Sequence, residues 1–265
     1  MTFVTRCGIL NLSDSNLYYA EGKGSDKTVK EEANKQKIWV VDCEFPAAIS
    51  ILGSYSVAGE SFDKWMPRFI RDQKKEGVRD VRQLAAAMQV RLEKLKGHAG
   101  ARAGKIIQLS GSVPAGKHFH PEVWTVQDYE LHVDPRTRNY IPRSVSDDNT
   151  FLCTEHFWSM SHNNKALRRL IGLRGGYWQY LNGTVNGRLA LGTIIPDLSS
   201  LYRNVFANTM TLFDPPETLE DFAVLACSYV RILDGLYRTR KHDKIAYIGS
   251  EPKYEIIKYP RGSIY

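Results

Sequence analysis

The order of strand-type and helix-type segments is the feature that most constrains this fold. Two segments, residues 60–73 and 78–96, carry apolar side chains at three- and four-residue spacings, the pattern of amphipathic helices. A third such segment begins at Thr218. Runs typical of β-strands precede the first two helices, separate them from the third and close the chain. This order predicts a layered α+β protein, and we expect a four-layer αββα sandwich of two stacked, mainly antiparallel sheets flanked by helices.

The N-terminal stretch contains three of the expected strands. Residues 2–12 (TFVTRCGILNL) are β-branched and apolar with partial alternation, so they predict one strand. Residues 13–16 (SDSN) have the composition of a turn, and residues 17–20 (LYYA) would then return as the second strand of a hairpin. A polar, glycine-marked crossing over residues 21–34 leads to a third strand over residues 37–42 (KIWVVD).

Three polar side chains recur evenly in the same stretch. Thr5, Glu21 and Lys37 follow one another at equal intervals along the sequence. If the hairpin places Thr5 opposite Glu21, its turn falls near Ser13, where the turn composition lies.

Composition narrows the classes of protein to consider. The chain has 265 residues, 43% of them hydrophobic and 25% charged, as in an ordinary soluble domain. No apolar run approaches the roughly 18 to 20 residues that a membrane helix needs, and no signal-peptide pattern is present. We therefore expect a cytoplasmic protein without a membrane partner. The net charge of +7 is spread along the chain and accompanies no DNA- or RNA-binding motif, so nucleic acid is not an expected partner.

Other reactive side chains form weaker patterns. The four cysteines are scattered without metal-type spacing, which is typical of buried thiols in a reducing compartment. His118 and His120 share a face of an extended segment and could bind a metal with Glu122, but a solvated strand is the expected structure. The aromatic segment 177–180 (YWQY) could stack a ligand, although packing is the commoner use. We expect no metal, because no third ligand is fixed by the spacing of the histidines. We also expect no cofactor, because the sequence contains no P-loop and no GxGxxG motif.

Two segments resemble a known family. In residues 37–73 a lysine opens a strand, an apolar strand ends in Gly-Ser and a helix follows; in residues 218–259 a long helix precedes a closing hairpin. Both resemble the proteasome β-subunits and bacterial proteasome-like peptidases, which are N-terminal-nucleophile (Ntn) hydrolases. The resemblance implies a single domain over residues 1–265, with a divergent, insertion-rich middle at about 98–215, and assembly into a homo-oligomer.

The resemblance also implies roles for individual residues. The family's nucleophile is an N-terminal threonine, followed at the same intervals by an acid and a lysine, so Thr5, Glu21 and Lys37 are the matching positions. Glu21 stands where the family has aspartate, and Thr5 would need the bond before it to be cut. Thr2 is a rival nucleophile that loss of the first residue would expose. Cys7 is a third candidate, because CGIL resembles the start of glutamine amidotransferases.

The implied activity is hydrolysis of a peptide or small amide substrate. The free α-amine of a mature N-terminal threonine, with a pKa of about 8, would accept the hydroxyl proton, and a nearby lysine would lower that pKa further. The alternative is a catalytically inactive member of the same fold that acts as a structural or binding subunit. A metal-dependent hydrolase using the histidines is a third, weaker hypothesis.

Overall fold

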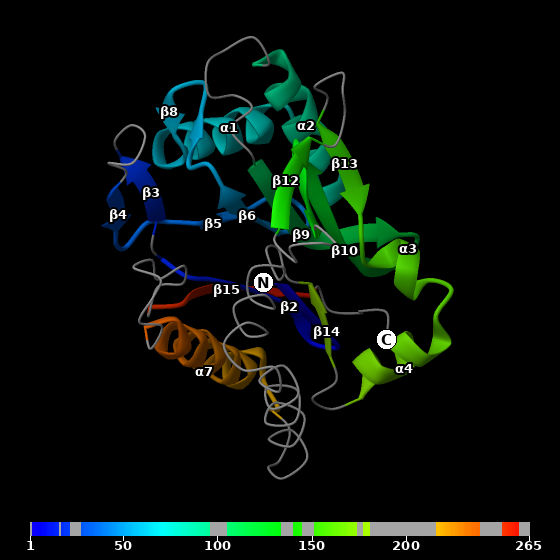
Figure 1. Cartoon of the computed structure of the whole chain (residues 1–265). Helices are drawn as coiled ribbons and strands as arrows, with labels where there is room; N and C mark the ends of the chain where they lie inside the picture. Colours follow the sequence, from blue (N-terminus) through cyan, green and yellow to red (C-terminus); the bar gives the residue numbers. More distant parts are fainter. Residues whose placement is uncertain are drawn as a thin grey trace.

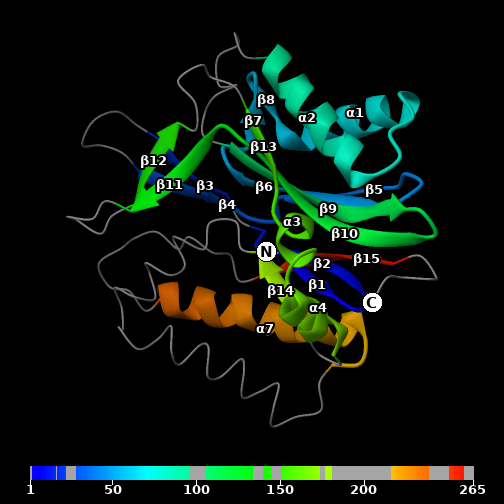
Figure 2. The same ribbon diagram turned by 90° about the vertical axis from the view of Figure 1, so that its right-hand side faces the viewer.

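Two antiparallel sheets stack face to face between helices, which gives four layers (Figures 1 and 2). The predicted α+β sandwich is therefore confirmed. The structure is a computed structural model, and it describes residues 2–15, 17–21, 28–95, 105–133, 140–144, 151–173, 177–180, 216–238 and 251–259. No helix among these residues is long and apolar enough to span a membrane. The extent of the domain stays a prediction.

The first sheet has four strands in the order β14-β1-β2-β15. Their bounds are β14 (Tyr177–Tyr180), β1 (Thr2–Thr5), β2 (Gly8–Ser13) and β15 (Lys253–Lys258). Helix α7 (Leu219–Arg238) covers the outer face, where Phe3 and Leu10 pack with Phe222. The helix begins with reciprocal hydrogen bonds: the Asp221 N–H donates to Thr218 Oγ1 at 3.0 Å, and that hydroxyl donates to the Asp221 carboxylate at 2.7 Å.

The second sheet has five strands in the order β13-β10-β9-β6-β5. Their bounds are β13 (Leu152–Glu155), β10 (His118–Gln127), β9 (Lys105–Ala115), β6 (Ala47–Gly53) and β5 (Ile38–Val41). Helices α1 (Phe62–Lys75) and α2 (Val81–Lys94) cover its outer face and bury the larger core of the protein. Their apolar stripes are the ones that the sequence predicts.

Shorter elements complete the described chain. Three small hairpins pair β3 (Leu17–Glu21) with β4 (Thr28–Glu32), β7 (Ser56–Val57) with β8 (Glu60–Ser61), and β11 (Tyr129–Val133) with β12 (Tyr140–Ser144). Helices α3 (Trp158–Ser161) and α4 (Lys165–Gly172) follow β13. Leu167 and Ile171 of α4 pack into the core between the sheets.

The N-terminal hairpin differs from the prediction. The segment expected as one strand is split into β1 and β2, which pair with each other across a turn at Arg6 and Cys7. The Thr5 hydroxyl stabilises this turn, because it accepts the Cys7 N–H at 3.1 Å and donates to the Gly8 carbonyl at 3.0 Å. Strand β3 pairs with β4 instead of β2. The β4 segment belongs to the expected polar crossing, so the sequence missed this strand.

Alternation along β1 decides which of its threonines faces the inside of the sandwich. Val4 packs between the sheets with Ala48 and Val123 of the second sheet, whereas Phe3 packs against α7. Thr2 therefore faces the second sheet and Thr5 faces α7.

Candidate functional site

A buried polar cluster around Thr2 lies between the two sheets. Thr2 is fully buried, and its hydroxyl donates to Asn11 Oδ1 at 2.8 Å. Gln108 Nε2 of β9 contacts the same hydroxyl, and the Ser110 hydroxyl donates to Asn11 Oδ1 at 2.8 Å. The register explains the arrangement, because Thr2 lies opposite Asn11 in the first sheet and β9 places Gln108 and Ser110 on one face of the second. Polar groups thus meet where two apolar sheet faces would otherwise pack.

Two amide atoms of this cluster have no hydrogen-bond partner. Asn11 Nδ2 and Gln108 Oε1 are both buried, on side chains that are 2% and 1% exposed. Unpaired buried polar atoms are costly to a fold and are uncommon in native proteins. The unused donor belongs to the Asn11 amide whose oxygen accepts the Thr2 hydroxyl, and an amide donor of this kind can stabilise negative charge on a substrate oxygen.

An ion pair lies at the same end of the sandwich. Lys37 Nζ donates to both carboxylate oxygens of Asp14, at 2.9 and 3.0 Å, and the two side chains are only 13% and 19% exposed. Asp14 directly follows β2, close to Asn11 in sequence, and Lys37 directly precedes β5. Across the second sheet, Ile38 of β5 pairs with Ser50 of β6, and Ser50 pairs with Gln108 of β9. Lys37 and Asp14 are therefore brought to the end of the sandwich that holds Thr2.

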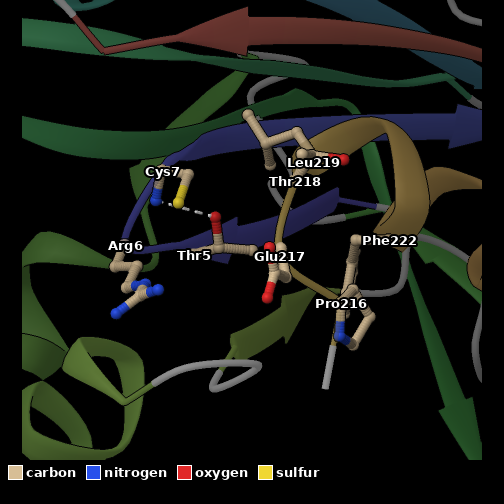
Figure 3. Close-up of a pocket in the computed structure, with 8 residues that line it drawn as sticks. All are labelled: Thr5, Arg6, Cys7, Pro216, Glu217, Thr218, Leu219 and Phe222. Atoms are coloured by element: carbon tan, nitrogen blue, oxygen red, sulfur yellow. Dashed lines mark hydrogen bonds between the residues drawn. The ribbon is translucent and has the colours of Figure 1, made fainter. Parts of the chain in front are cut away.

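Thr5 lies at the opposite end of β1, on the face that α7 covers. It is 7% exposed and lines a small hollow between the β1–β2 turn and the start of α7 (Figure 3). The other residues around the hollow are Arg6, Cys7, Pro216, Glu217, Thr218, Leu219 and Phe222. The Thr5 hydroxyl points to the turn, where the Cys7 N–H donates to it (Figure 3). The structure does not bring Thr5 and Lys37 together, because Lys37 lies at the end of the sandwich that holds Thr2, and Thr5 is at the other end of β1.

The remaining members of the predicted set lie apart from this cluster. Glu21 ends β3 and pairs with Thr28 of β4, and its side chain lies outside the described residues. Cys7 is exposed at the β1–β2 turn and its thiol is not in a disulfide. The combined role of Thr5, Glu21 and Lys37 stays a prediction.

The histidine motif forms a buried hydrogen-bonded pair instead of a solvated strand face. His118 is exposed, but His120 is 5% exposed and its Nε2 lies 2.8 Å from Glu122 Oε1. The same carboxylate accepts hydrogen bonds from Arg82 and from Trp124 Nε1, the latter at 2.7 Å. Burial raises the pKa of Glu122, but these hydrogen bonds outweigh it and hold the pKa below its ordinary value. Within the described ranges, no group of three or more His, Cys, Asp or Glu side chains is placed to bind a metal.

A second histidine lies beside the space between the sheets. His156 Nε2 is 2.7 Å from the hydroxyl of Thr125, which lies directly opposite Gln108 in the pairing of β10 with β9. Burial lowers the pKa of His156, which favours the neutral imidazole. The aromatic segment 177–180 forms β14, which pairs with β1, and Trp178 packs edge-to-face on Phe157.

Sequence reasoning missed Asn11, Gln108, Ser110 and Asp14. A signal was present, because Asn11 stands between two leucines, and Gln108 and Ser110 flank Leu109 in a run typical of a strand. Which of their faces would meet could not be known without the pairing of the two sheets. The composition around Asp14 predicts only a turn, and its partner Lys37 is 23 residues along the chain.

Comparisons with known proteins give only a weak likeness. No family model and no curated protein matches the chain. Among solved structures, Anbu (ancestral beta-subunit) from Yersinia bercovieri is 13% identical at a TM-score of 0.32, over 63% of this chain and 64% of that one. The Gly-1 mutant of Anbu from Hyphomicrobium sp. strain MC1 is also 13% identical at a TM-score of 0.32, over 66% and 70% of the two chains.

These values correct the family assignment made from the sequence. The chain spans less than two thirds of the length of the Yersinia protein, and similarity at this level does not place it among the proteasome-like Ntn hydrolases. The assignment to that family is therefore wrong. It rested on the order of the segments and on one even spacing, and neither is specific to one family. The function has to be argued from the chain's own geometry.

Proposed function

We propose that this chain hydrolyses an amide bond and that Thr2 is its nucleophile. The proposal requires cleavage of the bond between Met1 and Thr2, which would give Thr2 a free α-amine. The observation that supports it is the position of the Thr2 hydroxyl within a buried polar cluster that contains an unused amide donor on Asn11. Apolar side chains at those positions would pack the sheets at lower cost, so the cluster is consistent with a use other than packing.

The steps follow from ordinary acyl-transfer chemistry. The α-amine takes the hydroxyl proton while the Thr2 oxygen bonds to the substrate carbonyl carbon. The carbonyl oxygen becomes negative and accepts a hydrogen bond from Asn11 Nδ2. The C–N bond then breaks, the leaving amine takes the proton, and the ester that remains is hydrolysed by water. Lys37, oriented by Asp14, lowers the pKa of the α-amine by repulsion between like charges.

Matched valine variants test the choice of nucleophile. Valine has the branched shape of threonine without its hydroxyl. We expect Thr2→Val to abolish acylation by a β-lactone probe, whereas Thr5→Val should be acylated at close to the wild-type rate. The intact mass of the protein measures the acylation. Lys37→Ala should slow acylation by roughly tenfold or more, because the like charge that lowers the pKa of the α-amine is lost. Acylation that survives in Thr2→Val but is lost in Thr5→Val would contradict the proposal and favour the trio of Thr5, Glu21 and Lys37.

One observation favours a second function, that of a non-catalytic binding or structural subunit. Thr2 is fully buried and its hydroxyl already has a protein acceptor, as a purely structural threonine would. A protein that keeps Met1 and is never acylated would have this function. A peptide or small amide substrate, a cytoplasmic location and assembly into a homo-oligomer remain predictions under the first function.

A further inference from the structure

Exposed apolar side chains gather on the short helices α3 and α4. Met160 is 44% exposed, Leu170 is 48% exposed and Leu173, just after α4, is 54% exposed. Leu167 and Ile171 on the inner side of α4 bury in the core between the sheets, so the helix is amphipathic and fixed to the sandwich. Its outward apolar residues are therefore held at the surface. Figure 1 shows both helices at the side of the molecule, away from α1.

The same surface is positively charged. Lys165, Arg168 and Arg169 are exposed, and no described residue forms an ion pair with any of them. No residue from 156 to 196 is an aspartate or glutamate, so the sequence around α4 supplies no neutralising charge. We call this surface the α3–α4 face; its residues are Met160, Lys165, Arg168, Arg169, Leu170 and Leu173.

We propose that the α3–α4 face binds the surface of an anionic lipid bilayer, a partner that was not expected from the sequence. This goes beyond the proposed hydrolase function and is independent of it. Guanidinium and ammonium groups attract acidic headgroups, and aliphatic side chains between them enter the boundary with the acyl chains. Binding of this kind needs no spanning helix.

Two other occupants fit the face less well. A nucleic acid would use the cations, but exposed Leu170 and Leu173 offer nothing to phosphates, and Trp158 already stacks on His120 at 3.9 Å. A protein partner would favour exposed Trp or Tyr at the centre of the contact, and this face has only aliphatic side chains there. The combination of cations with aliphatic side chains favours lipid.

Helix α1 provides a matched control. Lys64 and Arg71 are exposed on its outer side and have no described ion-pair partner, but no large apolar side chain is exposed on α1. A charge reversal there changes the net charge as much as one on α4 without touching the α3–α4 face. Any effect of total charge alone would appear equally in both variants.

The experiment is co-sedimentation of the purified full chain with phosphatidylcholine vesicles that contain or lack phosphatidylserine, at low and high salt. We expect binding only with phosphatidylserine and weaker binding at high salt. The Arg168→Glu/Arg169→Glu variant should bind at least about tenfold more weakly, and Lys64→Glu/Arg71→Glu should bind as the wild type does. Leu170→Asn should also weaken binding while the net charge is unchanged. Circular dichroism would confirm that each variant is folded.

Several outcomes would overturn the proposal. Absence of binding to phosphatidylserine vesicles would do so, as would an equal loss in the α1 and α4 variants. Unchanged binding of Leu170→Asn would show that charge alone drives the binding, and it would contradict the insertion of aliphatic side chains into the bilayer. Retention on a single-stranded DNA column without binding to vesicles would identify the face as a nucleic-acid site. None of these results depends on acylation of Thr2, so failure here leaves the hydrolase proposal standing.

Discussion

At the scale of single residues, Glu122 is a buried carboxylate that several hydrogen-bond donors surround. Glu122 is 1% exposed and accepts hydrogen bonds from His120, Arg82 and Trp124, so its carboxylate is stabilised although it lies away from water. The sequence indicated His120 and Glu122 as possible metal ligands, but it did not predict that they form a buried hydrogen-bonded pair. It could not supply Arg82, which comes from α2 and meets Glu122 only in the folded chain.

This network predicts an acid-sensitive contribution to stability. The folded pKa of Glu122 lies below the unfolded value of about 4.3, so the stabilisation is complete above that value and is lost as the pH falls through the folded pKa. We expect the free energy of unfolding of Glu122→Gln to fall less between neutral and acidic pH than that of the wild type, by roughly 1 to 2 kcal/mol. Urea titrations across that pH range measure the difference.

Glu44→Gln is the matched control for that experiment. Glu44 forms an exposed ion pair with Arg79, which contributes little to stability because solvent screens it. Its pH dependence should stay close to that of the wild type. A Glu122→Gln variant with the full wild-type pH dependence would show that the network does not hold the carboxylate ionised.

At the scale of elements, local pattern predicted helices better than hairpins. The apolar stripes of α1, α2 and α7 depend on spacing within each segment, so the sequence was enough to find them. The β1–β2 hairpin depends on a turn at Arg6 and Cys7 that carries no turn composition and is held by the Thr5 hydroxyl. Its second strand opens at Gly8, where a Cβ would collide with the Ile257 carbonyl of β15.

Gly8 predicts a large effect of a small substitution. A Cβ at this position would lie 2.3 Å from the Ile257 carbonyl oxygen and 2.7 Å from Leu219 Cδ1, so β15 or α7 would have to move. We expect Gly8→Ala to lower the free energy of unfolding by roughly 1 to 3 kcal/mol or more, the cost of overpacking. Chemical denaturation followed by circular dichroism measures it.

Gly235 of α7 is the control, because a Cβ there would meet nothing within 4 Å. Gly235→Ala should raise the free energy of unfolding by about 0.5 to 1 kcal/mol, since alanine favours a helix more than glycine does. Equal effects of the two substitutions would mean that β15 does not lie against the start of β2 as the structure places it.

At the scale of the whole molecule, the layers were predictable and the site was not. Segment order was enough for an αββα sandwich, because amphipathic helices and half-buried strands have few ways to cover one another. The polar cluster depends on which strand positions of the two sheets face each other, and that is a property of the stacking. Thr2 was a rival nucleophile in the sequence and becomes the favoured one only because Gln108 and Asn11 surround its hydroxyl.

The most direct test of this account is to find which residue an amide-mimicking electrophile modifies. The protein is treated with a β-lactone and digested, and the modified peptide is sequenced by mass spectrometry. The account predicts a chain that begins at Thr2 and carries the adduct on that residue. An adduct on Thr5 or Cys7, or an unmodified chain that still begins with Met1, would contradict it.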